Sequence, residues 1–540
     1  MTMRRTTILG IATLLTFIAS AVTTTTYAAT TKPQLVINIV AGTLRADDLN
    51  RYSNNFCEGG LRRLMDNGVV CTNSVHDYLF TTTPAALATF ATGAQPSVHG
   101  ITNDFWWSYV DSSKVWLIKD DKYQSVPYST GSDNYSPSRL SAHTIGDMLI
   151  AQSPKSKLYT VAVDAISAIV LNGKAGMAFW AETNQTHWTT SSYYAESLPQ
   201  WINEYNRRDS NRFYKLRRWM PYYVSSSYLN SEVSLIKEIR AKSTKSLTGI
   251  DPKIIDSDFG QMCYTPAGNS MVLNFARNII TFEELGRDSD TDVINICLDT
   301  TRYIAELYGP ESIEYEDMIY RLDADIEKFL NAVYELVDPS QVVVTFSACH
   351  GTSPSYNPVG GVERDRFNSR QMEVIVNAFL GARYGSDSYI LGSHNNAIYL
   401  NHELILSKRL SLETIREEVA VFLLQLRGVA SAYPATALRY TSFAEGRSRL
   451  AQQSFHAARS GDVIIDLMPG WIIEESNIRS SSLSGYGYDK RIPLIIYGGG
   501  ISAKQVERVV KSTELAPTLA RIMQLETPWA SEELPMREVE

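Results

Sequence analysis

The sequence predicts an α/β fold in which helices flank a central, mostly parallel β-sheet. Three apolar runs rich in β-branched residues indicate this fold, at 34–41, 292–298 and 342–351. They lack the alternation of apolar and polar residues that marks a strand with one solvated face, so we expect strands buried on both faces. An amphipathic run at 312–337 predicts one of the helices that cover such a sheet.

The remaining elements are predicted from shorter patterns of the same kinds. In chain order they are a helix over 59–67, a strand at 69–72, a helix that opens at 81–84, a smaller α/β segment with elements at 397–400, 412–426 and 461–467, a strand at 492–497 and a closing helix over 515–523. Two stretches are expected to be inserted cap lobes, one at about 104–245, which is rich in Trp, Tyr and Ser, and one at about 357–475. No internal repeat separates these parts, so residues 29–540 are expected to form one large domain.

The first 28 residues have the pattern of a signal peptide. Arg4 and Arg5 precede an apolar run at 8–22, and small residues follow up to Ala28. This order predicts export, cleavage near Ala29 and a mature chain without a transmembrane span. The protein is therefore expected in the periplasm or outside the cell, and an uncleaved membrane anchor is the alternative.

The composition is that of a folded protein without a nucleic-acid partner. The 540 residues are 44% hydrophobic and 20% charged, with a formal net charge of −8. A nucleic-acid surface would need clustered Lys and Arg, and the sequence contains no such cluster. There are 5 cysteines. An oxidising compartment would permit a disulfide between Cys57 and Cys71, but the spacing leaves the pairing open.

Two polar clusters lie at positions where α/β proteins usually have their catalytic or binding residues. Cys349 and His350 end the strand at 342–351, and the carboxyl ends of such strands carry the binding sites of open α/β sheets. Thr82 and Thr83 precede Pro84 at the start of a helix, where unpaired amides and the helix dipole favour an anion. Such hydroxyls more often cap helices than attack phosphates, so the pattern alone leaves both roles open.

Longer motifs carry a family resemblance. Between Gln34 and Met523 the chain contains, in order, TTTP, ATGAQPSVHGITND, YTPAGNSMVLNFARNII, YGPESIEYEDMIYRLDADIEKFL, SACHG, SGDVIIDLMPGW, YDKRIPLIIYGGGI and ELAPTLARIM. These motifs resemble the alkaline phosphatase superfamily, specifically its nucleotide pyrophosphatase/phosphodiesterase branch and the phosphate-irrepressible alkaline phosphatases. The resemblance implies an alkaline-phosphatase-like sheet with inserted cap lobes, two zinc ions, and a Thr or Ser nucleophile between them.

Some positions of that family's site keep their residues here. The family spacing of Thr, one residue and Pro places the nucleophile at Thr82. The run from Pro84 to Gly93 is one residue longer than usual in the family, which leaves Thr83 as the alternative. Asn103 matches a phosphate-contacting asparagine of the family, and His350 matches one zinc ligand.

Most of the family's metal ligands are replaced. Their positions hold Gly42, Arg302, Glu306, Cys349 and Ser482. Arg302 and Glu306 stand four residues apart, so a chelating pair on one helix face has become a pair of opposite charges. Two cationic phosphate-binding residues of the family are also lost, at Asp164 and Ile166.

The resemblance and these replacements favour a pseudophosphatase, an alkaline-phosphatase-like protein with a binding or assembly role. It would need no cofactor, and its partner would be a protein or an anionic ligand of the cell envelope. Arg302 is expected to pair with Glu306 and fill the old metal site. The other possibility is that Arg302 holds an anion together with Asn103 and Thr82.

The alternative is an active metal-dependent phosphomonoesterase or phosphodiesterase with a rebuilt site. A single zinc ion would then be held by Cys349, His350 and a shifted acid, Asp299 or Asp489, with Thr82 as the nucleophile. Without a second metal, phosphoryl transfer lacks its main electrostatic stabiliser. The other histidines, His394 among them, show no ligand spacing and are expected to be packing or surface residues.

Overall fold

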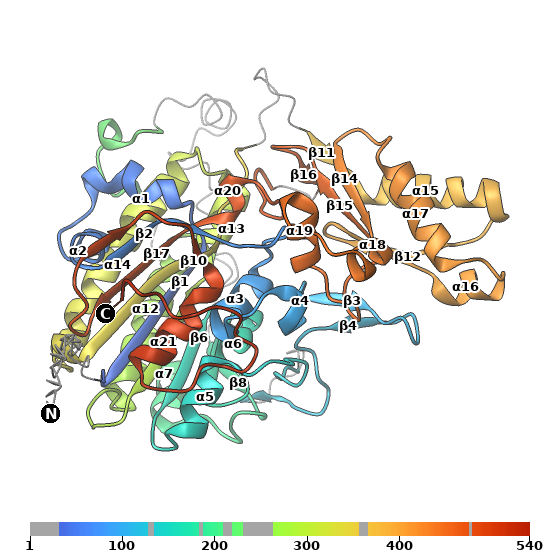
Figure 1. The fold of residues 1–540 in the computed structure, drawn as a ribbon. Coiled ribbons are helices and arrows are strands. Elements are labelled where there is room, and N and C mark those ends of the chain that lie inside the picture. The colour runs from blue at the N-terminus through green and yellow to red at the C-terminus, as the bar shows by residue number, and fades with distance from the viewer. Residues whose placement is uncertain are drawn as a thin grey trace, which may run out of the picture.

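The computed structural model describes residues 32–127, 134–182, 187–208, 219–230, 263–355, 365–474 and 478–539 (Figure 1). The predicted signal peptide at 1–28 lies outside this part of the chain, and so do pieces of both predicted insertions. Within the described ranges, no helix has the length and apolar character needed to cross a bilayer.

A sheet of 11 strands runs through the middle of the molecule, in the order β18-β2-β17-β10-β1-β9-β6-β7-β8-β5, with β19 also paired to β2. Five neighbouring strands, from β10 to β7, are parallel, and β17, β8 and β5 pair antiparallel. The predicted central, mostly parallel sheet is therefore confirmed. Its strands are β1 (Leu35–Thr43), β2 (Val69–Val75), β5 (Ser125–Val126), β6 (Leu158–Ala162), β7 (Met177–Glu182), β8 (His187–Ser191), β9 (Asp292–Leu298), β10 (Val342–His350), β17 (Arg491–Gly498), β18 (Lys504–Val506) and β19 (Val510–Lys511).

The three strands predicted to be buried on both faces form the centre of this sheet. All residues of β1, β9 and β10 are buried. The register pairs Thr43 of β1 with His350 of β10, and Ala41 of β1 with Leu298 of β9. The carboxyl ends of the three strands therefore meet at one edge, where the candidate site lies.

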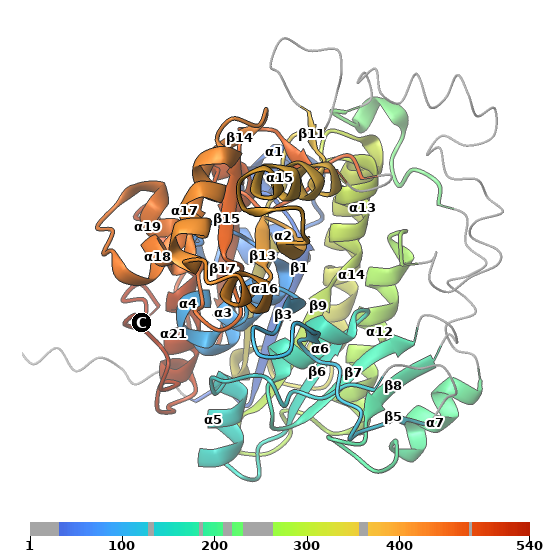
Figure 2. The same cartoon turned by 90° about the vertical axis from the view of Figure 1, so that its right-hand side faces the viewer.

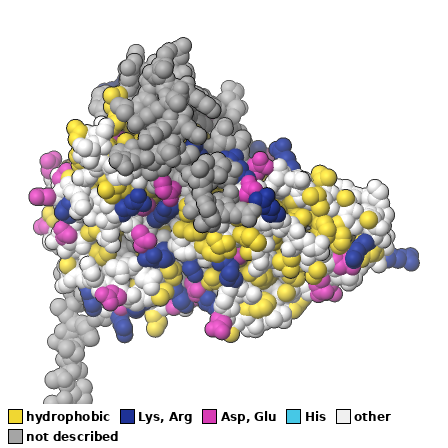
Figure 3. Space-filling view, turned by 90° about the horizontal axis from the view of Figure 1, so that it is seen from above, with side chains coloured by type: hydrophobic (Ala, Val, Ile, Leu, Met, Phe, Trp, Pro, Cys, Tyr) yellow, Lys and Arg dark blue, Asp and Glu magenta, His cyan; other side chains and the backbone are white. Residues whose placement is uncertain are grey.

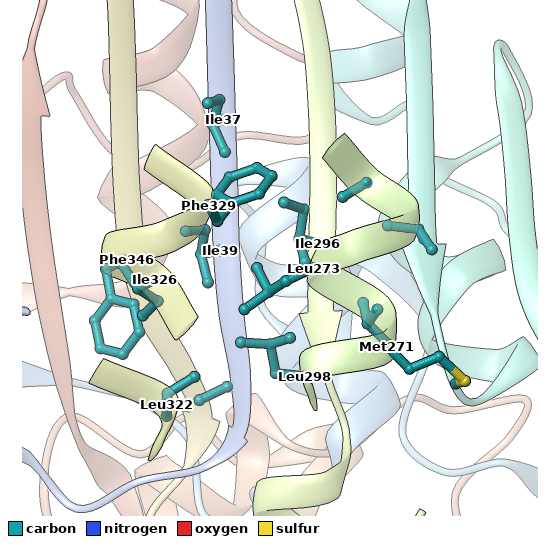
Figure 4. Packing of buried hydrophobic residues seen from close by; sticks show 14 of the residues in the cluster. Ile37, Ile39, Met271, Leu273, Ile296, Leu298, Leu322, Ile326, Phe329 and Phe346 are labelled. Carbon is teal, nitrogen blue, oxygen red and sulfur yellow. The ribbon is translucent and has the colours of Figure 1, made fainter. Parts of the chain in front are cut away.

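Helices cover both faces of the sheet, as Figures 1 and 2 show. On one face, α12 and α14 pack against the central strands. Figure 4 shows Leu273 and Phe329 of these helices beside Ile37, Ile39 and Ile296 of β1 and β9. The helices of the main body are α1 (Ala46–Tyr52), α2 (Leu61–Asn67), α3 (Thr83–Thr92), α4 (Pro96–His99), α5 (Ile145–Gln152), α6 (Ala165–Asn172), α7 (Gln200–Arg207), α12 (Ala267–Phe282), α13 (Thr300–Tyr308), α14 (Ile313–Tyr334), α20 (Gly487–Lys490) and α21 (Leu515–Ile522). A second cluster, with residues of α3, α5, α6 and α21, covers the opposite face.

The structure differs from the prediction for residues 104–245. Strands β5, β6, β7 and β8 fall within this range and extend the central sheet, so the range is not a cap as a whole. These strands are short and lie among many Trp, Tyr and Ser residues, which hid their apolar pattern. The hairpin of β3 (Phe105–Trp107) and β4 (Lys114–Trp116) does stand apart from the sheet, as a separate pair.

A smaller lobe occupies most of the second predicted insertion, on the right of Figure 1. It has its own antiparallel sheet, in the order β12-β13-β15-β14, and its own apolar core. Its elements are β11 (Arg366–Phe367), α15 (Ser369–Tyr384), β12 (Ile390–His394), β13 (Ala397–Leu400), α16 (His402–Ser407), α17 (Leu412–Leu423), β14 (Val429–Pro434), α18 (Ala435–Tyr440), α19 (Gly446–Gln453), β15 (Val463–Leu467) and β16 (Ile472–Ile473).

Two further features of the structure concern the cysteines and the distribution of surface charge. Cys57 and Cys71 are both free thiols, so the disulfide that the compartment would permit is not formed. On the face seen in Figure 3, Lys and Arg side chains alternate with Asp and Glu, and the described part of that face has no continuous basic area.

Candidate functional site

A cavity of about 280 Å³ lies at the carboxyl edge of the central sheet, beside the starts of α3 and α13. Most residues singled out in the sequence meet here. Its walls are formed by Thr82, Thr83, Pro84, Asn103, Asp104, Asp164, Ile166, Ser167, Arg302, Glu306, His350, His394, Asn395, Ile478, Ser481, Ser482 and Leu483. The fold therefore brings together the predicted nucleophile, the positions to which the resemblance assigns phosphate contacts, and three of the positions where it implies metal ligands.

The two candidate nucleophiles have different surroundings. Thr82 is the N-cap of α3: its hydroxyl donates to the Thr102 carbonyl at 2.9 Å and accepts from the Ala85 amide at 3.3 Å. Thr83 is the first residue of α3, and its hydroxyl lies 3.1 Å from Nε2 of His350. Both residues line the cavity. The Thr82 hydroxyl already donates one hydrogen bond and accepts one as the helix cap, while the Thr83 hydroxyl contacts His350. On this geometry Thr83, the alternative left open by the spacing, is our prediction for the residue that faces a substrate.

His350 is buried and engaged on both ring nitrogens. Nδ1 lies 2.8 Å from the Gly351 carbonyl and 3.3 Å from the Thr43 hydroxyl. A carbonyl only accepts, so Nδ1 carries the hydrogen and Nε2 accepts from Thr83. Burial lowers the pKa of His350 to about 3, and the nearby Arg302 charge acts in the same direction. The imidazole is therefore neutral at physiological pH.

Arg302 lies between two carboxylates at the start of α13. Its guanidinium is 3.5 Å from Oε1 of Glu306 and 3.5 Å from Oδ2 of Asp164, and it stacks on the Tyr303 ring at 4.6 Å. A Cβ at position 42 would lie only 2.9 Å from the Cβ of Arg302 and 3.3 Å from the Asp299 backbone, so glycine at 42 lets the start of α13 approach β1 closely.

Cys349 and Asp299 are turned away from the cavity. Cys349 is fully buried and contacts the Cys297 thiol, and this contact together with burial raises the pKa of Cys297 well above its usual range. Asp299 accepts hydrogen bonds from the amides of Val163 and Asp164 and from the Ser167 hydroxyl, at 3.1, 2.9 and 2.6 Å. Neither side chain lines the cavity.

Asp489, the other carboxylate considered as a ligand of a rebuilt zinc site, is also held by other hydrogen bonds. It is fully buried and accepts from the amide and the hydroxyl of Ser484, at 2.9 and 2.5 Å. Burial raises the pKa of Asp489 to about 8. The folded state therefore binds this proton more tightly than the unfolded chain does.

This raised pKa predicts a pH dependence of stability. Because the folded pKa of about 8 lies above the unfolded value of 3.8, the stabilisation is complete below about pH 4 and is lost progressively as the pH rises to about 8. We expect the fall in the free energy of unfolding to be clearest between about pH 7 and pH 8, above the ordinary histidine pKa of about 6.5. Urea unfolding of wild type and Asp489→Asn at several pH values checks this. A wild-type slope equal to that of the variant would contradict it.

Several residues of the cavity wall were not predicted from the sequence, and His394 and Asn395 are the two that come from the lobe. His394, expected to be a packing or surface residue, bonds through Nε2 to Oδ1 of Asp104 at 2.5 Å and stacks on the Phe105 ring at 3.7 Å. Asn395 donates to Oδ1 of Asn103 at 2.6 Å. The lobe hairpin β12–β13 thus meets the main body at the site. Because 290 positions separate Asp104 from His394, no local signal could have shown this.

The residues present do not fit the two zinc ions that the resemblance implies. Zinc sites need three or four N, S or O donors aimed at one point. Here Gly42 has no donor, Arg302 is a cation, Glu306 faces Arg302, and Cys349 does not reach the cavity. Within the described residues, no group of three His, Cys, Asp or Glu side chains is placed to hold a metal.

Comparisons with known proteins agree with the fold and with the family motifs. A family model described as type I phosphodiesterase / nucleotide pyrophosphatase matches residues 35–486. The alkaline phosphatase PafA of Elizabethkingia meningoseptica is 27% identical over 519 residues, which covers 94% of each chain. The alkaline phosphatase PhoV of Synechococcus elongatus is 25% identical over 509 residues, covering 93% of this chain and 92% of that one.

The solved structures agree with these matches. The crystal structure of wild-type PafA superposes with a TM-score of 0.86 at 26% identity, covering 94% of this chain and 99% of that chain. A murine ectonucleotide pyrophosphatase / phosphodiesterase, at 12% identity and a TM-score of 0.51, shares the fold. The chain therefore belongs to the type I phosphodiesterase / nucleotide pyrophosphatase family of the alkaline phosphatase superfamily.

Proposed function

We propose that this protein is a pseudophosphatase of the periplasm or cell exterior, which keeps the family fold for binding or assembly and has lost two-zinc catalysis. The observation that carries the proposal is the Arg302 guanidinium, held 3.5 Å from both Glu306 and Asp164 at a former ligand position. Gly42, at another position where the resemblance implies a metal ligand, supports the same view because it offers no donor side chain. The signal-peptide pattern of residues 1–28 supports the location.

The charge of the cavity also supports this function. Among the described residues, the carboxylates of Asp104, Asp164 and Glu306 line it together with one guanidinium, that of Arg302. A phosphate dianion would enter a cavity that already carries a negative excess, without metal ions to offset it. Arg302 is thus better suited to pairing inside the protein than to gripping an anion.

One observation favours the second candidate function, an active phosphoric ester hydrolase with a rebuilt site. The Thr83 hydroxyl points at the neutral His350 imidazole from the start of α3, as an activated nucleophile would. Relatives named alkaline phosphatases share this fold over nearly their whole length. This candidate would use Thr83 with His350, and any metal would need donors that the cavity residues do not now present.

Zinc content and hydrolysis, measured together, test the two functions. We expect the purified mature protein to retain no zinc after equilibration with excess zinc and desalting, and to leave p-nitrophenyl phosphate and its bis ester uncleaved. Retention of about one zinc ion that His350→Ala abolishes would overturn the proposal.

A matched pair of threonine variants then separates chemistry from folding. If the protein does hydrolyse phosphoesters, Thr83→Ala is expected to lower the rate by at least about 100-fold, since it removes the nucleophile. Thr82→Ala should cost about 1 kcal/mol of stability through the lost cap and leave most of the rate.

A further inference from the structure

A second, larger cavity lies beside the candidate site, and none of the family motifs accounts for it. It measures about 910 Å³ and runs between the hairpin β3–β4 and the lobe. Its walls come from Trp107 and Lys114, from the start of α15, from β12 and from β16. His394 and Asn395 line both cavities, so a ligand in the larger one can reach the candidate site.

The charges of this groove balance. Lys114 and Arg370 face it with Glu373 and Glu474. Both carboxylates already accept hydrogen bonds: Glu373 from the Ser393 amide at 2.7 Å, and Glu474 from the Asn368 amide group at 2.5 Å. Lys114 rests on the rings of Phe105 and Trp107, at 4.8 and 5.0 Å. The described residues of the groove therefore carry no excess charge that would favour a strongly anionic or cationic ligand.

The groove is also closed to an extended peptide. Strand β12 is an edge strand of the lobe sheet, and such edges commonly bind a peptide as an added strand. Here side chains of α15 already accept hydrogen bonds from the backbone amides of β12 that point away from the lobe sheet. Glu373 accepts from the amide of Ser393, and Asn377 accepts from that of Ile390 at 3.2 Å. A ligand must therefore bind through side chains.

The side chains of the groove suit a ligand with many hydroxyls. Amide, hydroxyl, carboxylate and guanidinium groups offer donors and acceptors around it, and Leu391 and Ile473 add apolar surface between them. The Ser369 hydroxyl is buried and has no hydrogen-bond partner in the described part of the chain. A buried hydroxyl left unpaired is unfavourable, so a ligand or an ordered water is expected to satisfy it.

We propose that this groove binds an uncharged oligosaccharide, with one end of the ligand at His394 and Asn395. Its volume of about 910 Å³ is near the upper end of the range for small-molecule sites, about 300–1,000 Å³, and its balanced polar lining matches neutral sugar rings better than ions. The site is separate from the proposed loss of hydrolysis, and each can fail without the other.

The test uses the mature protein and four neutral tetrasaccharides: chitotetraose, cellotetraose, maltotetraose and mannotetraose. Binding is measured by calorimetry at millimolar concentration. We expect saturable binding of at least one of them, weakened about tenfold or more by Arg370→Ala and by Ser369→Ala, because each removes a hydrogen-bonding group of the groove. The control is Arg383→Ala, at the far end of α15, where the arginine pairs with Glu418 outside the groove.

Several outcomes would overturn the proposal. One is the absence of binding by all four sugars. Another is binding that Arg370→Ala and Ser369→Ala leave unchanged. A third is that tripolyphosphate or penta-alanine binds, that the same two variants weaken this binding, and that no sugar binds. Phosphoester hydrolysis by the wild type would overturn the proposed pseudophosphatase and leave the groove proposal standing.

Discussion

A variant in which all five positions of the implied metal ligands are changed back is expected to retain zinc, whereas the wild type is expected to retain none. The changes are Gly42→Asp, Arg302→Asp, Glu306→His, Cys349→Asp and Ser482→His. Together with His350 they would return two closed sets of donors to the carboxyl edge of the sheet. Metal content after desalting measures the first effect. Hydrolysis of p-nitrophenyl phosphate measures the second, with a rise over wild type of at least about 100-fold expected once the metals stabilise the developing charge.

The matched control is Gly42→Asp alone. A Cβ at position 42 would lie 2.9 Å from the Cβ of Arg302, so this single change should destabilise the fold by about 1–3 kcal/mol through overpacking. It should not confer zinc binding. A folded five-position variant without zinc, or zinc retention by the single variant, would contradict this account of the site.

Asp462→Ala is expected to have the largest effect on stability. Asp462 is fully buried in the lobe and accepts from the Leu400 amide, from Nε2 of His402 and from Nε of Arg416, at 2.8, 2.8 and 2.7 Å. Removing the carboxylate leaves the Arg416 charge, whose side chain is only 12% exposed, without its partner. The expected loss is about 3–5 kcal/mol in the free energy of unfolding.

Hydrogen exchange and urea unfolding check this expectation. Protection should fall first in β13 and α17, which carry Leu400 and Arg416, while the central sheet keeps its protection. The control is Asp387→Ala in the same lobe, where a carboxylate 44% exposed pairs with Lys408 and should matter by less than about 1 kcal/mol. Equal midpoints for the two variants would show that the Asp462 cluster does not hold the lobe together.

The centre of the fold could be predicted because its pattern is continuous along the chain. Strands β1, β9 and β10 are buried on both faces, so each is a mainly apolar run without regular alternation, and motif order located the site at their ends. Strands β5 to β8 were missed because they are short and lie in aromatic, Ser-rich sequence, where composition resembles a surface lobe.

The candidate site could be predicted only where a motif marks it. Arg302 and Glu306 pair because their spacing on a helix is fixed, and the structure adds Asp164 as a second partner. The choice between Thr82 and Thr83 depends on where α3 begins, which spacing could not settle to one residue. The Asp104–His394 contact depends on how the lobe docks, and no pattern within either segment records that.

Gly42 also limits how the site could be rebuilt. A Cβ at position 42 would lie 2.9 Å from the Cβ of Arg302 and 3.3 Å from the backbone of Asp299. Shortening the side chain at 302 would leave both contacts in place, because every residue except glycine carries a Cβ. A carboxylate at 42 therefore also requires the start of α13 to move away from β1 by a few tenths of an ångström. The spacing between a helix and a strand, and not the side chains alone, is thus part of what a metal site at this edge would have to recover.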